Sequence, residues 1–116
     1  MDDCIFCKIV RAEIPAKKIY EDDEILAFQD IRPQAPVHFM LIPKKHIDSL
    51  IQATAADAGV LGRMLAMSGR LAIEQGARDG FRTVINSGRV GCQDVMHLHI
   101  HVLGGPDPLG RMLPRN

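Results

Sequence analysis

The sequence predicts an α+β fold: an antiparallel sheet of about five strands, with one main helix and a short N-terminal helix. Three observations lead to this prediction. Several short apolar or alternating segments are bounded by turn residues, which is typical of strands. Residues 55–76 instead carry apolar side chains at helical spacing. The length of 116 residues, 47% of them hydrophobic and 24% charged, suits a single compact domain.

The N-terminal part of the chain predicts a short helix followed by a hairpin. Apolar residues between positions 5 and 10 indicate an amphipathic helix that ends at about Arg11, before Pro15. Residues 17–29 predict two strands joined by an acidic run at positions 21–24. That run has the composition of a metal site, but we interpret it as the solvated tip of the hairpin.

The middle of the chain predicts a central strand and the main helix. Residues 37–42 are almost continuously apolar, which indicates a strand covered on both faces and a half-buried His38. Within residues 55–76, Gly76 suits the C-terminal cap of the helix. The stripe that we expect to face the sheet consists of Leu61, Met64, Leu65, Leu71 and Ala72, with Ser68 as a gap.

The last strand is predicted at residues 96–105, where histidine alternates with apolar residues before two glycines. Successive side chains on a strand point to opposite faces. The three histidines would therefore share one face: His97, His99 and His101. The other face would contact the core: Met96, Leu98, Ile100 and Val102. Residues 81–86 predict its antiparallel neighbour, and a proline-rich tail follows at residues 106–116.

Two other interpretations of the histidine segment are a half-exposed strand with histidines on its wet face, and one metal ion bound by all three rings. Same-face neighbours on a strand lie roughly 6.6 Å apart, so a nearly straight strand would not bring three rings to one ion. We therefore expect the three histidines to have different roles.

Charge and hydropathy exclude several classes of protein. Lys plus Arg and Asp plus Glu both number 14, so there is no basic excess to indicate a nucleic-acid partner. No apolar run approaches the roughly 18 residues of a membrane span. The acidic N-terminus lacks the pattern of a secretory signal. We expect a cytoplasmic protein.

The Cys4-Ile5-Phe6-Cys7 segment is a candidate metal site, because a Cys-x2-Cys turn brings two thiolates to one tetrahedral ion, usually zinc. No second Cys-x2-Cys follows, so further ligands would be histidines. Two reduced structural thiols are an equally good explanation of the pair alone. A redox pair fits less well, because no strand precedes the motif.

Residues 86–101 together suggest phosphoryl or nucleotidyl transfer. A neutral imidazole is a nucleophile near pH 7 and can attack phosphorus to give a covalent phosphohistidine. A second, protonated imidazole and the N–H groups of the glycine-containing loop at 87–94 would stabilise the charge on the phosphoryl oxygens. Acyl transfer is less natural, since no serine or cysteine stands obviously beside these histidines.

The segments Asn86-Ser-Gly, Gly91, Gln93 and His97-x-His99-x-His101-Val-Leu-Gly-Gly resemble the histidine triad (HIT) superfamily, and most closely its Hint branch of nucleotide-binding proteins and purine nucleoside phosphoramidases. The resemblance extends over nearly the whole chain, including Cys-Ile-Phe-Cys-Lys-Ile and Ile-Pro-Lys-Lys-His-Ile. It implies a single HIT domain over residues 1–116, with 106–116 as a C-terminal tail, and a homodimer whose two sheets join.

The resemblance also implies site residues. His99 would be the nucleophile, His101 would bind the phosphate and assist transfer, and His38 would support that network. The implied nucleotide-binding residues are Asp30, Ile31, Asn86, Gly91, Gln93, His99 and His101, for a purine nucleotide of the AMP or GMP type. As in bacterial zinc-binding relatives, Cys4, Cys7, His46 and His97 would hold a structural Zn²⁺, and no organic cofactor is implied.

Three alternatives for function follow. The first is hydrolysis of the P–N bond of purine nucleoside 5′-phosphoramidates, and of aminoacyl adenylates, through a nucleotidyl-histidine. The second is hydrolysis of dinucleoside polyphosphates, although Leu103-Gly104-Gly105 favours the Hint branch. The third is a zinc-stabilised nucleotide-binding module that acts through a partner. Cys92 and Asp94 depart from the commonest family pattern beside the expected phosphate site.

Overall fold

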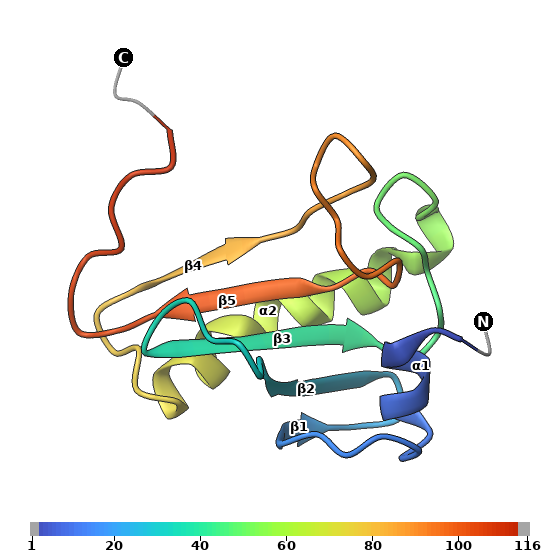
Figure 1. Ribbon diagram of the computed structural model, residues 1–116, viewed down its shortest axis with the longest axis horizontal. Coiled ribbons are helices and arrows are strands. Elements are labelled where there is room, and N and C mark those ends of the chain that lie inside the picture. The colour runs from blue at the N-terminus through green and yellow to red at the C-terminus, as the bar shows by residue number, and fades with distance from the viewer. Residues whose placement is uncertain (1–2, 114–116) are drawn as a thin grey trace.

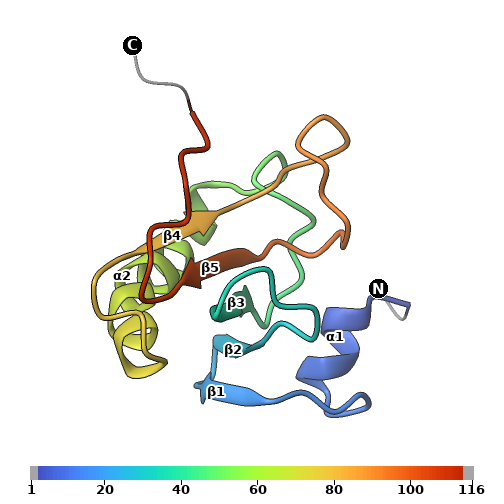
Figure 2. The same cartoon turned by 60° about the vertical axis from the view of Figure 1, so that its left-hand side comes forward.

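A computed structural model describes residues 3–113 and shows five antiparallel strands, as the sequence predicted (Figure 1). The strand order in the sheet is β1-β2-β3-β5-β4. The elements are α1 (Ile5–Val10), β1 (Lys18–Glu21), β2 (Ile25–Gln29), β3 (Val37–Pro43), the 3₁₀ turn η1 (Ala55–Asp57), α2 (Ala58–Glu74), β4 (Phe81–Val84) and β5 (Ile100–Gly104). Strand β3 is central and buried along its whole length, as its apolar sequence predicted. Residues 105–113 follow β5 without helix or strand (Figure 2).

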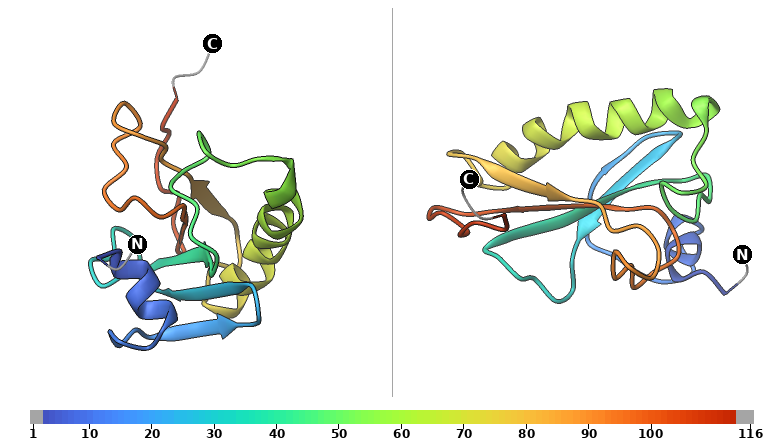
Figure 3. Two further views of the ribbon diagram at one scale, coloured as in Figure 1. Left: turned by 90° about the vertical axis from the view of Figure 1, so that its right-hand side faces the viewer. Right: turned by 90° about the horizontal axis from the view of Figure 1, so that it is seen from above.

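The sheet separates two apolar clusters, one on each face. Helix α2 packs on one face against alternate residues of the strands, such as Phe39 and Val102. Helix α1 lies on the opposite face, where Phe6 and Ile9 pack against Met40 (Figure 3). Because neighbouring residues of a strand point to opposite faces, the histidines of the last strand share the face of α1, and the apolar residues between them face α2.

Helix α2 begins and ends at signals that the sequence carries. Thr54 and Asp57 form a capping box at η1. At the other end, Gly76 has φ +111°, and the N–H groups of Gly76 and Ala77 donate to the carbonyl oxygens of Ile73 and Ala72. This is the arrangement of a Schellman motif. The expected cap at Gly76 is confirmed.

Part of the predicted helical stripe is wrong. Leu65 is 48% exposed, whereas Ser68 is buried and lies in the stripe that faces the sheet. The Ser68 hydroxyl donates to the carbonyl oxygen of Leu65, at 2.7 Å. This bond satisfies the polar group inside the helix, so hydrophobicity alone misplaced the buried face by one position.

The hairpin tip at Asp22 is fastened to helix α2 rather than merely solvated. Asp22 accepts hydrogen bonds from the Tyr20 hydroxyl and from the N–H groups of Glu24 and Ile25, and it forms an ion pair with Arg63 of α2 at 2.6 Å. Burial raises the pKa of this carboxyl group, but the hydrogen bonds outweigh burial and lower the pKa to about 2.

We expect the substitution Asp22→Asn to lower the free energy of unfolding at pH 7 by about 1–2 kcal/mol, because several hydrogen bonds to a charged acceptor are weakened. The pKa of Asp22 is lower in the folded state than its ordinary 3.8. Its contribution is therefore complete above about pH 5 and is lost as the pH falls towards 2. Urea unfolding at pH 7 and pH 3 should show the difference from wild type shrinking at pH 3. A constant difference would contradict this assignment, and Asp23→Asn, at an exposed neighbour, is the control.

Among residues 3–113, no helix is long and apolar enough to cross a membrane.

Candidate functional site

The last strand begins later than predicted, so only one of its three histidines lies within it. Strand β5 starts at Ile100, and His97 precedes it in an extended segment. The N–H of Leu98 donates to the carbonyl oxygen of Ile47, at 2.7 Å, rather than to a neighbouring strand. Met96 is 48% exposed and does not face the core as expected. The alternation of side chains nevertheless continues from 97 to 102, with Leu98 in the α2-facing cluster.

His99 has one nitrogen held and one nitrogen free. Its Nδ1 lies 2.8 Å from the carbonyl oxygen of His97. A carbonyl oxygen only accepts, so Nδ1 carries the proton and Nε2 has a lone pair. The residue is 1% exposed, and Nε2 is the one buried side-chain nitrogen or oxygen without a hydrogen-bond partner among residues 3–113. A buried unsatisfied polar atom costs stability, which makes it a candidate functional atom.

Two side chains lie beside the His99 ring. The ring of Phe6 contacts it edge-on, with centroids 5.2 Å apart and planes at 90°. The Oδ1 atom of Asp94 lies 3.6 Å from Nε2, although the Asp94 side chain is 77% exposed. The sequence gave Asp94 no role. Only the structure shows that its carboxylate approaches the free nitrogen of His99.

A second group, formed by His38, His101 and Asp30, is linked by hydrogen bonds with a defined direction. The N–H of Gln34 donates to Nδ1 of His38, at 3.0 Å. Nε2 of neutral His38 therefore carries the proton and donates to Nδ1 of His101, at 2.9 Å. It follows that the proton of neutral His101 is on Nε2. Asp30 Oδ2 lies 3.3 Å from Nε2 of His38 and 3.9 Å from Nδ1 of His101.

Burial is the main influence on the protonation of both rings. It lowers the pKa of His38, against the opposing charge of Asp30. Burial likewise lowers the pKa of His101, with the charges of His99 and His38 acting in the same direction. Both rings are consequently neutral near pH 7, as the direction of the hydrogen bonds requires.

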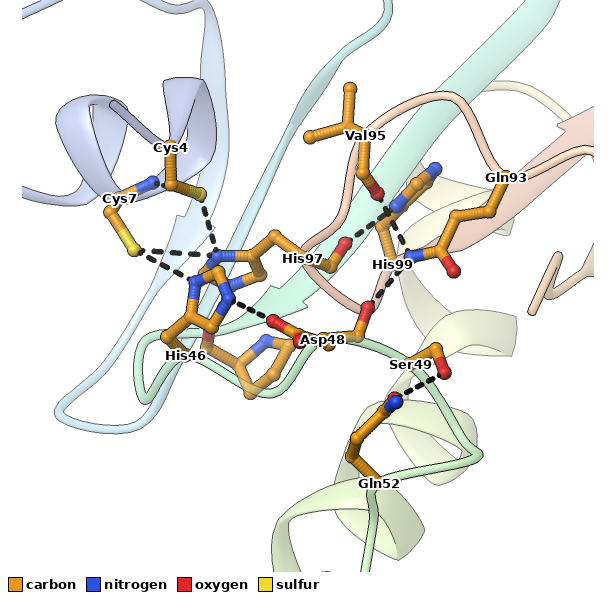
Figure 4. A network of polar contacts seen from close by, with 11 residues as sticks. Cys4, Cys7, His46, Asp48, Ser49, Gln52, Gln93, Val95, His97 and His99 are labelled. Carbon is orange, nitrogen blue, oxygen red and sulfur yellow. Dashed lines mark hydrogen bonds and ion pairs between the residues drawn. The ribbon is translucent and has the colours of Figure 1, made fainter. Parts of the chain in front are cut away.

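The cluster of Cys4, Cys7, His46 and His97 fits a tetrahedral metal ion (Figure 4). Its four ligand atoms lie within 4.8 Å of one another. Nδ1 of His97 is 3.3 Å from Sγ of Cys4, and Nδ1 of His46 is 3.2 Å from Sγ of Cys7. Tetrahedral zinc with bonds of about 2.0–2.3 Å would separate sulfur and nitrogen by roughly 3.5 Å. The four residues come from α1, from the loop after β3 and from the segment before β5.

The other nitrogen of each cluster histidine faces an acceptor, which leaves the Nδ1 lone pair for a metal. Nε2 of His97 donates to the carbonyl oxygen of Pro43, at 2.8 Å, and Nε2 of His46 donates to Oδ1 of Asp48, at 2.6 Å. Such partners orient the histidine ligands of metal sites. Burial, together with the neighbouring Cys4 thiol, raises the pKa of the Cys7 thiol to about 11 in the metal-free protein.

The same test argues against a metal at Asp30, His38 and His101, whose ligand atoms also converge. A metal on Nε2 of neutral His38 would move the ring proton to Nδ1. That nitrogen already accepts the Gln34 N–H, so two donors would oppose each other. Among the described residues, the hydrogen bonds therefore favour the cysteine-containing cluster as the metal site.

The loop at residues 87–94 is tightly folded. Gln93 Oε1 accepts the N–H of Gly88, while its Nε2 donates to the carbonyl oxygens of Asp48 and Val95. Cys92 has φ +60°, a conformation that favours glycine. This explains in physical terms why a glycine would suit position 92. Both polar ends of Gln93 are used within the protein.

We expect Gly91→Ala to lower the free energy of unfolding by about 1–2 kcal/mol. A Cβ atom at this position would lie 2.6 Å from the carbonyl oxygen and 2.8 Å from the nitrogen of Ser87, so the loop would have to move. Thermal unfolding measures the change. Gly59→Ala is the control, because a Cβ there meets nothing within 4 Å and alanine favours a helix. Equal effects of the two substitutions would contradict the prediction.

The remaining expected nucleotide-binding residues lie apart from the histidines. Ile31 is 91% exposed and lines an open pocket with Asp30, Pro15 and Lys17. Asn86 is half-buried, two residues after β4 ends. Sequence reasoning missed Phe6, Gln34 and Asp48 as partners of the histidines. The position of Phe6 between two cysteines and the His46-x-Asp48 spacing were the available signals.

Comparison with known proteins gives consistent matches. The family described as "HIT domain" matches residues 11–107. The chain is 51% identical over 106 residues to "Protein HitA" from Neisseria gonorrhoeae, covering 91% of this chain and 99% of that protein. A "HIT family hydrolase" from Clostridium thermocellum superposes with a TM-score of 0.91 at 38% identity, covering 97% and 99% of the two chains. A "HIT family hydrolase" from Legionella pneumophila gives 0.86 at 45% identity, covering 90% and 95%.

Proposed function

This chain belongs to the HIT domain family, and on that basis we propose that it hydrolyses the P–N bond of purine nucleoside 5′-phosphoramidates through a nucleotidyl intermediate on His99. The observation that carries the proposal is the buried Nε2 of His99, which has a lone pair and no partner among the described residues. A module that only binds nucleotides would not need such an atom. Solved hydrolases of the family with similar folds support a hydrolytic reaction in general.

The first step is attack of the His99 Nε2 lone pair on phosphorus. The P–N bond to the leaving group breaks, and its electron pair remains on the leaving nitrogen, which takes a proton. The Nε2–H of His101 is the proposed donor, because the hydrogen bond from His38 fixes the proton on that nitrogen. The carbonyl oxygen of His97 stabilises the positive charge that develops on the His99 ring.

The second step is hydrolysis of the phosphohistidine. Water attacks phosphorus, the bond to Nε2 of His99 breaks, and the electron pair returns to Nε2. The proton of the attacking water restores His101, and the nucleoside monophosphate leaves. In this proposal Asp30 accepts hydrogen bonds from the ribose, and the pocket beside Ile31 holds the base.

Zinc is the proposed occupant of the Cys4, Cys7, His46 and His97 cluster. It would be structural, since all four positions of a tetrahedral ion are filled by protein ligands. Its contribution would be to join α1, the loop after β3 and the histidine segment.

The test is release of AMP from adenosine 5′-phosphoramidate, measured beside release from a diadenosine polyphosphate. We expect rapid turnover of the phosphoramidate and little of the polyphosphate. The reverse ranking would favour dinucleoside polyphosphate hydrolysis. If neither substrate turns over while AMP binds, the protein is a nucleotide-binding module.

We also propose a homodimer whose sheets join. In the single chain β4 pairs with β5 on one side and is the last strand of the sheet order. Light scattering at micromolar concentration should report twice the chain mass, and a stable monomer would contradict this proposal.

A further inference from the structure

The candidate metal cluster and the nucleotide site share a residue, His97. Its ring nitrogen Nδ1 belongs to the cluster, 3.3 Å from Sγ of Cys4, and its carbonyl oxygen accepts the Nδ1–H of His99 (Figure 4). The His97 side chain is fully buried, with Nε2 held by the carbonyl oxygen of Pro43. Any change in the position of the His97 main chain therefore moves the acceptor that orients the His99 ring.

A second connection runs through Asp48 and Gln93. The Asp48 carboxylate accepts from the cluster ligand His46, at 2.6 Å, and the Asp48 carbonyl oxygen accepts from Nε2 of Gln93, at 2.7 Å. Oε1 of Gln93 in turn accepts the N–H of Gly88, at 2.9 Å. Gln93 thus joins the loop that carries His46 to the loop at 87–94.

A third connection is Phe6, which lies between the two cysteines. Its ring contacts the rings of His97 and His99, with centroids 5.9 Å and 5.2 Å away. Helix α1 has six residues, far fewer than an isolated helix needs for stability in water. Its position consequently depends on its contacts, including those that a metal ion would make with Cys4 and Cys7.

We propose that metal occupancy of this cluster and nucleotide binding at His99 each increase the affinity for the other, with His97, Gln93 and Phe6 as positioning residues. This inference rests on the proposed function, because it takes a nucleoside monophosphate as the ligand. The physical reason is that a metal ion fixes three groups that the nucleotide site also needs: the His97 carbonyl, the Phe6 ring and the Gln93 carboxamide. Binding free energies are linked, so the two affinities change by one common factor.

The primary experiment measures that factor in both directions with AMP and Zn²⁺. Calorimetry gives the affinity for AMP with zinc loaded and with zinc removed. Competition with a chromogenic chelator gives the affinity for zinc with and without saturating AMP. We expect AMP binding to weaken about fivefold or more on zinc removal, and zinc binding to tighten by the same factor when AMP is present.

The variant Gln93→Leu tests the second connection. It leaves His99 and all four cluster ligands in place, and we expect the coupling factor to fall by about twofold or more. Because this factor is a ratio of two affinities of the same variant, loss of any direct contact between Gln93 and phosphate cancels. Gln52→Leu is the matched control. Gln52 lies on the same loop and bonds Ser49 (Figure 4), so its coupling factor should equal that of wild type.

The zinc-free protein could unfold, so a second measurement uses only the loaded protein. With Co²⁺ in place of Zn²⁺, AMP should shift the visible absorption bands of the metal. Equal zinc affinities with and without AMP, or, for a chain that unfolds without zinc, unchanged Co²⁺ bands in the AMP-bound protein, would overturn the coupling alone. Failure of AMP to bind the loaded protein would instead overturn the proposed function and the coupling with it.

Discussion

His99→Ala is expected to lower turnover of adenosine 5′-phosphoramidate by roughly four orders of magnitude or more, as loss of a covalent nucleophile does in other enzymes. The reason is specific to this ring: its Nδ1–H is held by the His97 carbonyl oxygen, so Nε2 presents a buried lone pair. Another imidazole cannot take over, since the Nδ1 of His101 already accepts a hydrogen bond from His38. AMP release measured by chromatography gives the rate.

Two further measurements make the His99 result decisive. AMP binding should persist within about tenfold in His99→Ala, which shows that the site is intact. His99→Gln fills more of the space beside Phe6 but has no nucleophilic nitrogen, and it should be equally inactive. A His99→Gln protein that retains a few per cent of the wild-type rate would place the nucleophile elsewhere.

Cys7→Ser is expected to have the largest effect on stability. The Sγ of Cys7 is buried and lies 3.2 Å and 3.5 Å from the ligand nitrogens of His46 and His97. Serine is a poor zinc ligand, and metal binding to such a cluster contributes directly to folding. We expect the purified protein to lose stoichiometric zinc, and its melting temperature to fall by about 10 °C or more.

Cys92→Ser is the matched control for Cys7→Ser. Cys92 is exposed and lies outside the cluster, so zinc content and melting temperature should remain close to those of wild type. Metal analysis and calorimetry are performed on both variants. If Cys7→Ser retained full zinc, or if both variants lost it equally, the four-residue cluster would be the wrong metal site.

The sequence was sufficient for the fold where periodicity reports burial directly. The continuous apolar run of β3 and the alternation around Ile100 depend on local patterns that survive in the folded chain. The errors arose where a distant contact decided the outcome. Ser68 is buried because its hydroxyl bonds the backbone of its own helix, and β5 starts late because Leu98 bonds Ile47. Neither contact has a local sequence signature.

The site shows the same limit more sharply. Residue types and family resemblance named the histidines and cysteines that the structure brings into two clusters. They could not give the direction of the hydrogen bonds, which depends on the Gln34 N–H facing His38 and on the carbonyl oxygens of Pro43 and His97. These backbone groups determine which nitrogen carries each proton, and therefore which cluster suits a metal and which ring suits attack.

The spacing of His97 and His99 also restricts how this segment can change in length. Both side chains reach the face of α1 because exactly one residue, Leu98, separates them and points to the face of α2. Inserting or deleting a single residue here would reverse the parity of everything on one side of the change. Either the ligand or the nucleophile would then be directed into the apolar cluster under α2. Substitutions at position 98 can be absorbed, but length changes between the two centres are tolerable only in pairs.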